Sequence, residues 1–207
     1  MLRVDLAVPY ADRHDARQLG ARWDPSHRVW FVPPNRDASP FVRWLPAASP
    51  INVRAASHFI AAGTLECWRC QGRSAVHGFA LPAGHETSLV DEETGEVTWE
   101  VSEEPTLVCY LEFASAAAIE RMRLRTPNFR LAMRNRTRSC YWANFCEYCG
   151  TKLGDYDVFC EPGQGLMPLT GEEAASILLE PVTEPFAATA GGWSLGVELF
   201  EFMTLLG

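Results

Sequence analysis

The sequence predicts an α+β fold in two unlike parts, a small β-α-β-β-α domain over residues 1–46 and a larger mixed domain over 58–169. Three observations predict it. Strand and helix signals alternate in the first 46 residues, residues 47–57 have the Ala, Ser and Pro content of a linker, and two CxxC pairs stand 75 residues apart in a region of β-prone runs. A C-terminal tail over 170–207 follows and is expected to be helical and to pack on the core or on a partner.

The small domain takes its order from capping and turn residues. Asp12 is a candidate N-cap, Gly20 a helix stop, and Asp24-Pro25-Ser26-His27 a turn between two β-prone runs. The expected elements are a strand at 4–6, a helix at 13–19, a hairpin of 22–23 with 29–32, and a helical turn at 39–44. Fewer than about fifty residues rarely make a stable core alone, so this unit is expected to rest on the remainder of the chain.

The larger domain shows strand runs and one amphipathic helix. The expected elements are strands at 64–66, 74–81, 96–101 and 106–113, a hairpin turn at 91–95, and a helix at 116–125. Thr126-Pro127 should end that helix. The tail is predicted to hold two short helices, near 172–179 and 195–206.

Four of the seven cysteines have the spacing of a zinc site. Cys67, Cys70, Cys146 and Cys149 form two CxxC turns, and each turn presents two thiolates at the separation that tetrahedral zinc requires. Gly72 and Gly150 follow these turns, where positive φ is often needed. We therefore expect one structural Zn²⁺ and a zinc-ribbon-based domain with a folded insertion between its two knuckles. Disulfides and redox chemistry are the alternatives.

The zinc prediction also bears on activity. Four cysteine ligands leave no coordination position for substrate or water, so the chain is not expected to be an enzyme. No other catalytic constellation is visible in the sequence. Whether Cys160 or a histidine supplements the four thiolates stays open at this stage.

The formal charge of −8 is unevenly distributed. Eight acidic residues and no Lys or Arg occur over 86–104, whereas seven arginines and no acid occur over 121–138. The two segments can pair with each other or lie on solvated faces, or the arginines can form a basic surface with a function.

Arginines next to aromatic residues indicate a nucleic-acid surface, because single strands bind through phosphate contacts and base stacking. An alternative is that Trp23 and Trp30 form the core of their hairpin. The candidate residues are Arg22, Trp23, Arg28 and Trp30 on the hairpin, with Arg134, Arg136, Arg138, Tyr141 and Trp142 in the larger domain.

Two family resemblances attach to these motifs. Val8-Pro9-Tyr10, the run 16–25 and Trp30-Phe31-Val32-Pro33 resemble a small domain of unknown function in plasmid and mobile-element proteins, including TraC-type primases. The hairpin more distantly resembles the HARP domain of annealing helicases, which binds DNA forks. Both relatives imply association with nucleic acid.

The second resemblance lies around the cysteines. The runs 66–70 and 141–144, Cys146, Cys149-Gly150, Gly154-Asp155 and Glu161-Pro162-Gly163 resemble a group of uncharacterised bacterial zinc-ribbon proteins. Cys160 stands where those proteins are expected to carry His, so this chain departs from their pattern at that position.

The sequence therefore supports two functions. The leading one is a zinc-stabilised, non-enzymatic accessory protein that binds single-stranded or distorted DNA, linked to mobile elements or DNA processing. The rival is a protein-interaction module, such as an immunity, antitoxin or anti-restriction factor, that contacts a basic partner through its acidic hairpin. The sequence shows no signal peptide and no apolar run long enough to span a membrane, so a cytoplasmic protein is expected.

Overall fold

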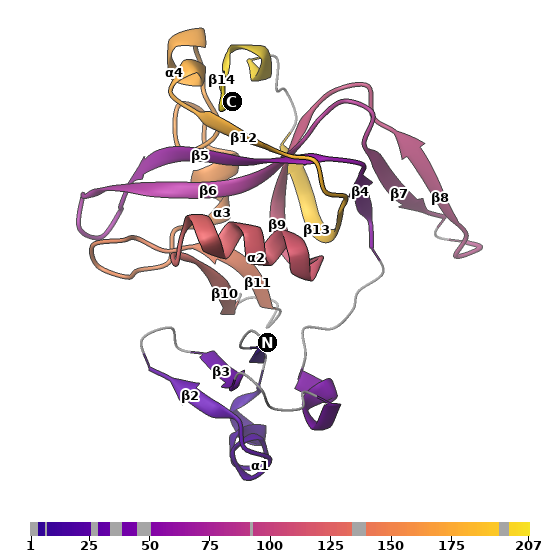
Figure 1. Ribbon diagram of the computed structural model, residues 1–207, viewed down its shortest axis with the longest axis vertical. Helices are drawn as coiled ribbons and strands as arrows, with labels where there is room; N and C mark the ends of the chain where they lie inside the picture. Colours follow the sequence, from indigo (N-terminus) through magenta and orange to yellow (C-terminus); the bar gives the residue numbers. More distant parts are fainter. Residues whose placement is uncertain are drawn as a thin grey trace.

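A computed structural model describes residues 4–6, 8–25, 29–33, 39–44, 51–91, 93–133, 140–194 and 199–207. Its elements are mixed α and β and mostly strands, which confirms the predicted fold class. In Figure 1 the small N-terminal unit lies below three elements of the larger part, α2 (Ala116–Arg125), β10 (Phe129–Met133) and β11 (Cys140–Asn144).

The N-terminal unit is a three-stranded antiparallel sheet with one short helix. Its elements are β1 (Val4–Leu6), η1 (Tyr10–Asp12), α1 (Arg13–Gln18), β2 (Arg22–Asp24), β3 (Val29–Val32) and η2 (Ser39–Trp44), with strand order β1-β3-β2. Asp12 directly precedes α1, as expected, but it makes no capping hydrogen bond. Its carboxylate instead accepts from Trp44 Nε1 at 2.8 Å, which satisfies an indole buried in this unit's own core.

A nine-stranded sheet forms the larger part. Its order is β14-β12-β5-β6-β9-β13-β4-β7-β8, and every neighbouring pair is antiparallel except β12 with β14. The strands are β4 (Val53–Ala55), β5 (His58–Glu66), β6 (Arg73–Leu81), β7 (Glu86–Val90), β8 (Val97–Val101), β9 (Thr106–Ala114), β12 (Leu178–Val182), β13 (Phe186–Ser194) and β14 (Thr204–Leu205). A separate antiparallel pair is formed by β10 (Phe129–Met133) and β11 (Cys140–Asn144).

Alternation along the strands builds a core on each face of the sheet. In β6, Phe79 and Leu81 pack with α2 (Ala116–Arg125), whereas Val76 and Ala80 pack with α3 (Asp155–Phe159) and α4 (Gly171–Ala175). The second core also contains Cys67 and Cys146, so one metal-ligand candidate of each CxxC pair belongs to the folded interior, whereas Cys70 and Cys149 are exposed. None of the helices in the described part of the chain has the length and apolar character to cross a membrane.

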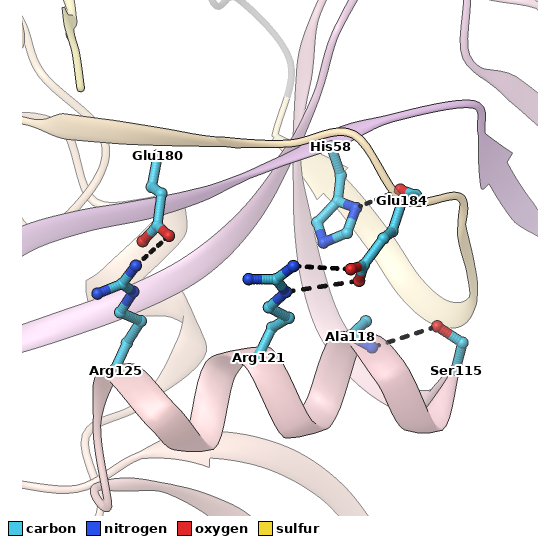
Figure 2. A network of polar contacts seen from close by, with 7 residues as sticks. All are labelled: His58, Ser115, Ala118, Arg121, Arg125, Glu180 and Glu184. Atoms are coloured by element: carbon cyan, nitrogen blue, oxygen red, sulfur yellow. Dashed lines mark hydrogen bonds and ion pairs between the residues drawn. The ribbon is translucent and has the colours of Figure 1, made fainter. Parts of the chain in front are cut away.

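The arginines of α2 form ion pairs with acids far away in the sequence. Figure 2 shows Arg121 paired with Glu184 (2.7 Å) and Arg125 paired with Glu180 at the edge of the helix. Arg123 pairs with Asp5 at 3.2 Å and so links the N-terminal unit to the larger part. The acidic 86–104 segment does not supply these partners, so the alternative in which the two charged segments pair with each other does not hold for the arginines of α2.

The tail and the linker differ from prediction. Residues 53–55 of the expected linker form β4, and the tail contributes β12, β13 and β14 to the sheet instead of being helical throughout. The helix expected near 172–179 is short and ends at Ala175. Local signals fail here because β13 has the sequence Phe-Ala-Ala-Thr-Ala-Gly-Gly-Trp-Ser, and Ala and Gly are depleted in strands. Its strand geometry comes from pairing with β9 and β4.

Candidate metal centre and N-terminal surface

The four predicted cysteines meet in space. Their Sγ atoms all lie within 4.8 Å of one another, with 3.7 Å between Cys67 and Cys149 and 3.7 Å between Cys70 and Cys146. Zn–S bonds of ~2.3 Å at tetrahedral angles place sulfurs about 3.8 Å apart. A disulfide needs about 2.05 Å, and all four cysteines are free thiols. The cluster can hold a metal ion, and its geometry is consistent with zinc.

The two knuckles are built alike although they come from different places in the chain. The first, 67–72, is the turn between β5 and β6, closed by the Glu66–Arg73 pair. The second, 146–151, is closed by an antiparallel bridge between Phe145 and Lys152. The same two backbone hydrogen bonds occur in each turn: Gln71 N to Cys67 O and Cys67 N to Gly72 O in the first, and Gly150 N to Cys146 O and Cys146 N to Thr151 O in the second.

The left-handed residue of the first knuckle is not the predicted glycine. Gln71 has φ of 59°, which matches φ of 66° at Gly150 in the equivalent position directly after the second cysteine. Gly72 is one residue further along, and the expectation of positive φ there is wrong. Its lack of a Cβ has another use, because a Cβ at this position would lie 2.8 Å from Tyr148 Cδ2.

The knuckles also contact each other through aromatic side chains. Tyr148 of the second knuckle lies against Gly72 of the first. Trp68 of the first knuckle donates from Nε1 to the carbonyl of Lys152, at 3.3 Å, beside the second. Both rings remain about two-thirds exposed, at 68% for Trp68 and 66% for Tyr148.

Asn144 and Ser74 attach the second knuckle to β6. The buried Asn144 amide accepts from His77 N and donates to His77 O, both at 2.8 Å, as a strand partner would. The Ser74 hydroxyl accepts from the Glu147 N–H at 3.1 Å. These contacts give the Tyr-Trp-Ala-Asn motif a structural role, because its Asn fixes the start of the second knuckle against the sheet that carries the first.

The thiols of the cluster influence one another's ionisation. Burial opposes ionisation of Cys146, but the N–H groups of Cys149 and Tyr148, with the thiols of Cys149 and Cys67, lower its pKa to about 7. A hydrogen bond from Gly72 favours the Cys70 thiolate, but desolvation and the three other thiols outweigh it and raise its pKa to about 12. Of these two thiols, Cys146 therefore ionises more readily than Cys70.

Cys160 does not supplement the four thiolates. In the described residues, Cys67, Cys70, Cys146 and Cys149 are the one group of three or more metal-ligating side chains close enough to share an ion. Cys160 packs against the second core, and burial raises its pKa although a contact with Cys109 opposes the shift. Cys109 is itself buried in β9, as a small core residue.

The structure separates the predicted nucleic-acid residues. Arg22 and Trp23 are exposed on β2, an edge strand, whereas Trp30 opposite Trp23 is buried, with ring centroids 5.7 Å apart. The alternative of a hairpin core therefore holds for Trp30 and not for Trp23. Four predicted residues lie outside the described part of the chain, namely Arg28, Arg134, Arg136 and Arg138.

Tyr141 and Trp142 are a correction to the predicted surface. Both are buried, at 4% and 8% exposure, and Trp142 stacks on Phe129 with centroids 5.9 Å apart. Neither ring can accept a base without opening the core. Alternation in β11 does not expose either ring, because Tyr141 contacts Tyr110 of β9, with ring centroids 6.4 Å apart, and Trp142 packs in the core that contains buried residues of α2.

Sequence reasoning missed two further features. Tyr10 is 78% exposed, and the Arg13 guanidinium lies 3.7 Å from its ring centroid. The Tyr10–Arg13 spacing of three residues at a helix start is a signal that could have found this pair.

The second missed feature is a buried carboxylate under the sheet. Asp155 is 2% exposed and accepts from the Tyr110 N–H at 2.7 Å. Tyr110 has φ of 52° within β9, and a Cβ on Gly191 of β13 would lie 3.0 Å from the Tyr110 Cβ. Gly191 leaves room for this irregularity in β9. The Asp155 carboxylate accepts from the Tyr110 N–H, which the irregularity removes from the pairing between strands.

Comparison with known proteins identifies the N-terminal unit. Residues 3–46 match the family model described as Domain of unknown function (DUF5710). A DUF5710 domain stands at the N-terminus. This confirms the resemblance to the small TraC-associated domain predicted from the motifs.

The same DUF5710 region is similar to two curated proteins. One DNA primase TraC of Escherichia coli is 44% identical over 51 residues, which is 25% of this chain and 4% of that protein. A second DNA primase TraC of Escherichia coli is 46% identical over 48 residues, 23% of this chain and 4% of the relative. The chain thus spans only a small fraction of these relatives. No solved structure matches the chain.

Proposed function

We propose that this protein is a zinc-stabilised, non-enzymatic accessory factor that binds single-stranded nucleic acid through its DUF5710 domain. The observation that carries the proposal is the exposed set of aromatic and arginine side chains on that domain. The set comprises Tyr10, Trp23, Arg13, Arg17 and Arg22. Its similarity to a segment of DNA primases supports a DNA-related context.

The charge of the DUF5710 domain supports an anionic ligand. Residues 1–46 contain seven arginines and five aspartates, in a chain whose formal charge is −8. Arginines neutralise phosphates, and exposed rings on an edge strand and a helix start can stack on unpaired bases. A single strand fits better than a duplex, because its bases are accessible to Tyr10 and Trp23.

The larger part would then act as scaffold. Four thiolates close the coordination shell of a bound zinc ion, so the metal would stabilise the two knuckles and leave no position for substrate. Arg123 and Asp5 connect this scaffold to the DUF5710 domain through α2. We infer a zinc-ribbon-like centre that fixes the sheet on which the binding domain rests.

The test is fluorescence anisotropy with a labelled oligothymidylate of about 20 nucleotides. Replacing Tyr10 and Trp23 together by Ala should weaken binding at least about tenfold, since each stacked base contributes ~1 to 3 kcal/mol. Arg22→Glu should reduce the slope of log K against log salt by about one. Arg69→Glu, an exposed arginine on the first knuckle, is the charge-matched control and should bind like the wild type.

The DUF5710 surface is not the binding site if the wild-type protein binds no oligonucleotide at low salt, or if the Tyr10/Trp23 variant binds the oligonucleotide as well as the wild type. Circular dichroism of each variant confirms that binding is compared between folded proteins.

A second candidate function rests on the β7–β8 hairpin. Figure 1 shows this hairpin projecting from the sheet, and β8 is an edge strand. Its exposed apolar residues lie among acids that form no ion pair within the described residues: Leu89, Val90, Val97 and Val101 among Glu93, Glu96, Glu100, Glu103 and Glu104. A basic protein partner fits this surface. The double variant Val97→Lys with Val101→Lys should no longer capture such a partner. The double variant Tyr10→Ala with Trp23→Ala should capture it as the wild type does.

A further inference from the structure

A groove of about 610 Å³ lies beside the first metal knuckle and belongs to neither surface described above. The side chains that matter for its chemistry come from three parts of the fold: Glu66 and Trp68 at the end of β5 and the start of the knuckle, Arg73 at the start of β6, and Asp157 with Gln164 from α3 and the loop after it.

The loop that forms one wall is held rigidly. Gly163 N donates to Met167 O and Leu166 N donates to Val158 O, both at 2.7 Å. Gly63 and Gly165 allow the loop to approach the sheet, because a Cβ on Gly63 would lie 2.6 Å from Gly165 O. A preformed wall lowers the entropic loss on binding.

The other wall carries an oriented aromatic ring. The Trp68 indole is fixed at one edge by its hydrogen bond to the Lys152 carbonyl, at 3.3 Å, yet 68% of the residue is exposed. A ring held in this way is available to a ligand, and its π face attracts cations.

The charges of the groove favour a cationic ligand. Glu66 and Asp157 form no ion pair in the part of the chain that the structure describes. Arg73 donates from Nε to Thr64 Oγ1 at 3.1 Å and keeps its positive charge, so with the two carboxylates the groove retains a net negative charge. Two carboxylates on a chain of charge −8 would repel the phosphates of a nucleic acid.

The groove continues past the loop. A smaller cavity of about 80 Å³ shares Thr64, Arg73 and Gln164 with the first and reaches Glu173 at its far end. The two adjoining cavities together are lined by the carboxylates of Glu66, Asp157 and Glu173 and by the guanidinium of Arg73. Carboxylates spread over two adjoining cavities suit an extended peptide better than a compact small molecule.

We propose that this groove binds an extended basic peptide segment of a protein partner, with one lysine or arginine side chain over Trp68 and between Glu66 and Asp157. Cation–π contact and charge-assisted hydrogen bonds act on the same cation. The site is independent of the DUF5710 surface. It would give the protein a peptide partner in addition to the nucleic acid proposed for that surface.

The test uses a fluorescein-labelled peptide of alternating Arg and Ala, with a control peptide in which citrulline replaces Arg. The wild-type protein should bind the Arg peptide at least about tenfold more tightly than the citrulline peptide. Glu66→Gln with Asp157→Asn should remove most of that difference, and Trp68→Ala should weaken binding roughly fivefold. The double variant changes exposed or half-buried carboxylates and should retain the wild-type melting temperature.

Matched controls decide between this groove and the acidic hairpin. Glu100→Gln with Glu103→Gln removes the same charge from the β8 region and should leave peptide binding unchanged. Equal binding by the groove variant and the wild type, or loss of binding in the hairpin variant alone, would overturn the proposal. Quenching of Trp68 fluorescence by oligothymidylate, absent in Trp68→Phe, would assign the groove to nucleic acid and overturn it as well.

Discussion

Tyr148 of the second knuckle packs against Gly72 of the first, at a distance that leaves no room for a Cβ atom on residue 72. The contact joins two turns that are 75 residues apart in sequence, so the knuckles contact each other through these side chains as well as through their four clustered thiols. Left-handed backbone at Gln71 and Gly150 completes the matched pair of turns.

The two left-handed positions should respond oppositely to substitution. Gly150→Gln should lower the free energy of unfolding by about 1 to 2 kcal/mol, since a side chain there is strained although the surrounding space is open. Gln71→Gly should be neutral or stabilise by up to about 1 kcal/mol, because relief of strain is partly offset by a more flexible unfolded chain. Urea unfolding of the zinc-loaded proteins measures both. A loss of stability in Gln71→Gly would contradict this account.

Metal content should depend on four cysteines. Cys67→Ser is expected to lose zinc and to give insoluble or molten protein, because binding energy of ~10 to 16 kcal/mol is also folding energy in small zinc sites. Elemental analysis should find one zinc per wild-type chain. Cys160→Ser is the matched control and should retain full metal, since Cys160 lies outside the cluster. The metal centre would be refuted if Cys67→Ser kept the spectrum of the wild-type protein and neither Cys67→Ser nor the wild type contained zinc.

Asp155 should matter far more for stability than its neighbour Asp157. Asp155→Ala removes the acceptor of the Tyr110 N–H and should destabilise the protein by about 2 to 3 kcal/mol, because a buried donor loses its charge-assisted bond. Asp157→Ala, on the same short helix, should change stability by less than about 0.5 kcal/mol. Chemical denaturation at fixed pH compares them. Equal effects would show that the buried hydrogen bond is not important for the fold.

His58 should make the fold acid-sensitive. Burial lowers its pKa below 6.5, and the nearby Arg121 acts in the same direction, while Glu184 opposes the shift through its carbonyl and its charge. The unfolded chain therefore binds more protons below about pH 6.5, so stability should fall as the pH drops through that range. Thermal melts between about pH 7.5 and 5.5 should show a shallower pH dependence for His58→Phe. Zinc content is checked at each pH, because loss of metal would produce a slope that His58→Phe does not change.

Local signals predicted several elements well. Helix α2 has the expected bounds of 116–125, because Ser115 caps its first turn and Thr126-Pro127 stops it, and both effects act within a few residues. The DUF5710 strands and turns were predicted for the same reason. Strand β12 was not, because its sequence next to α4 continues a helical pattern, and pairing with β5 and β14 makes it extended.

The sequence by itself determined the four cysteines of the candidate metal site, since CxxC spacing fixes the separation of two sulfurs within each turn whatever surrounds it. It also determined the DUF5710 domain, whose motifs are local. Tertiary structure alone decided which aromatic residues face solvent. Trp23 remains exposed on an edge strand, whereas Trp142, in an equally favourable sequence context, stacks on Phe129 inside the core. Burial depends on which elements pack over a strand, and that is set by contacts between residues distant in the chain.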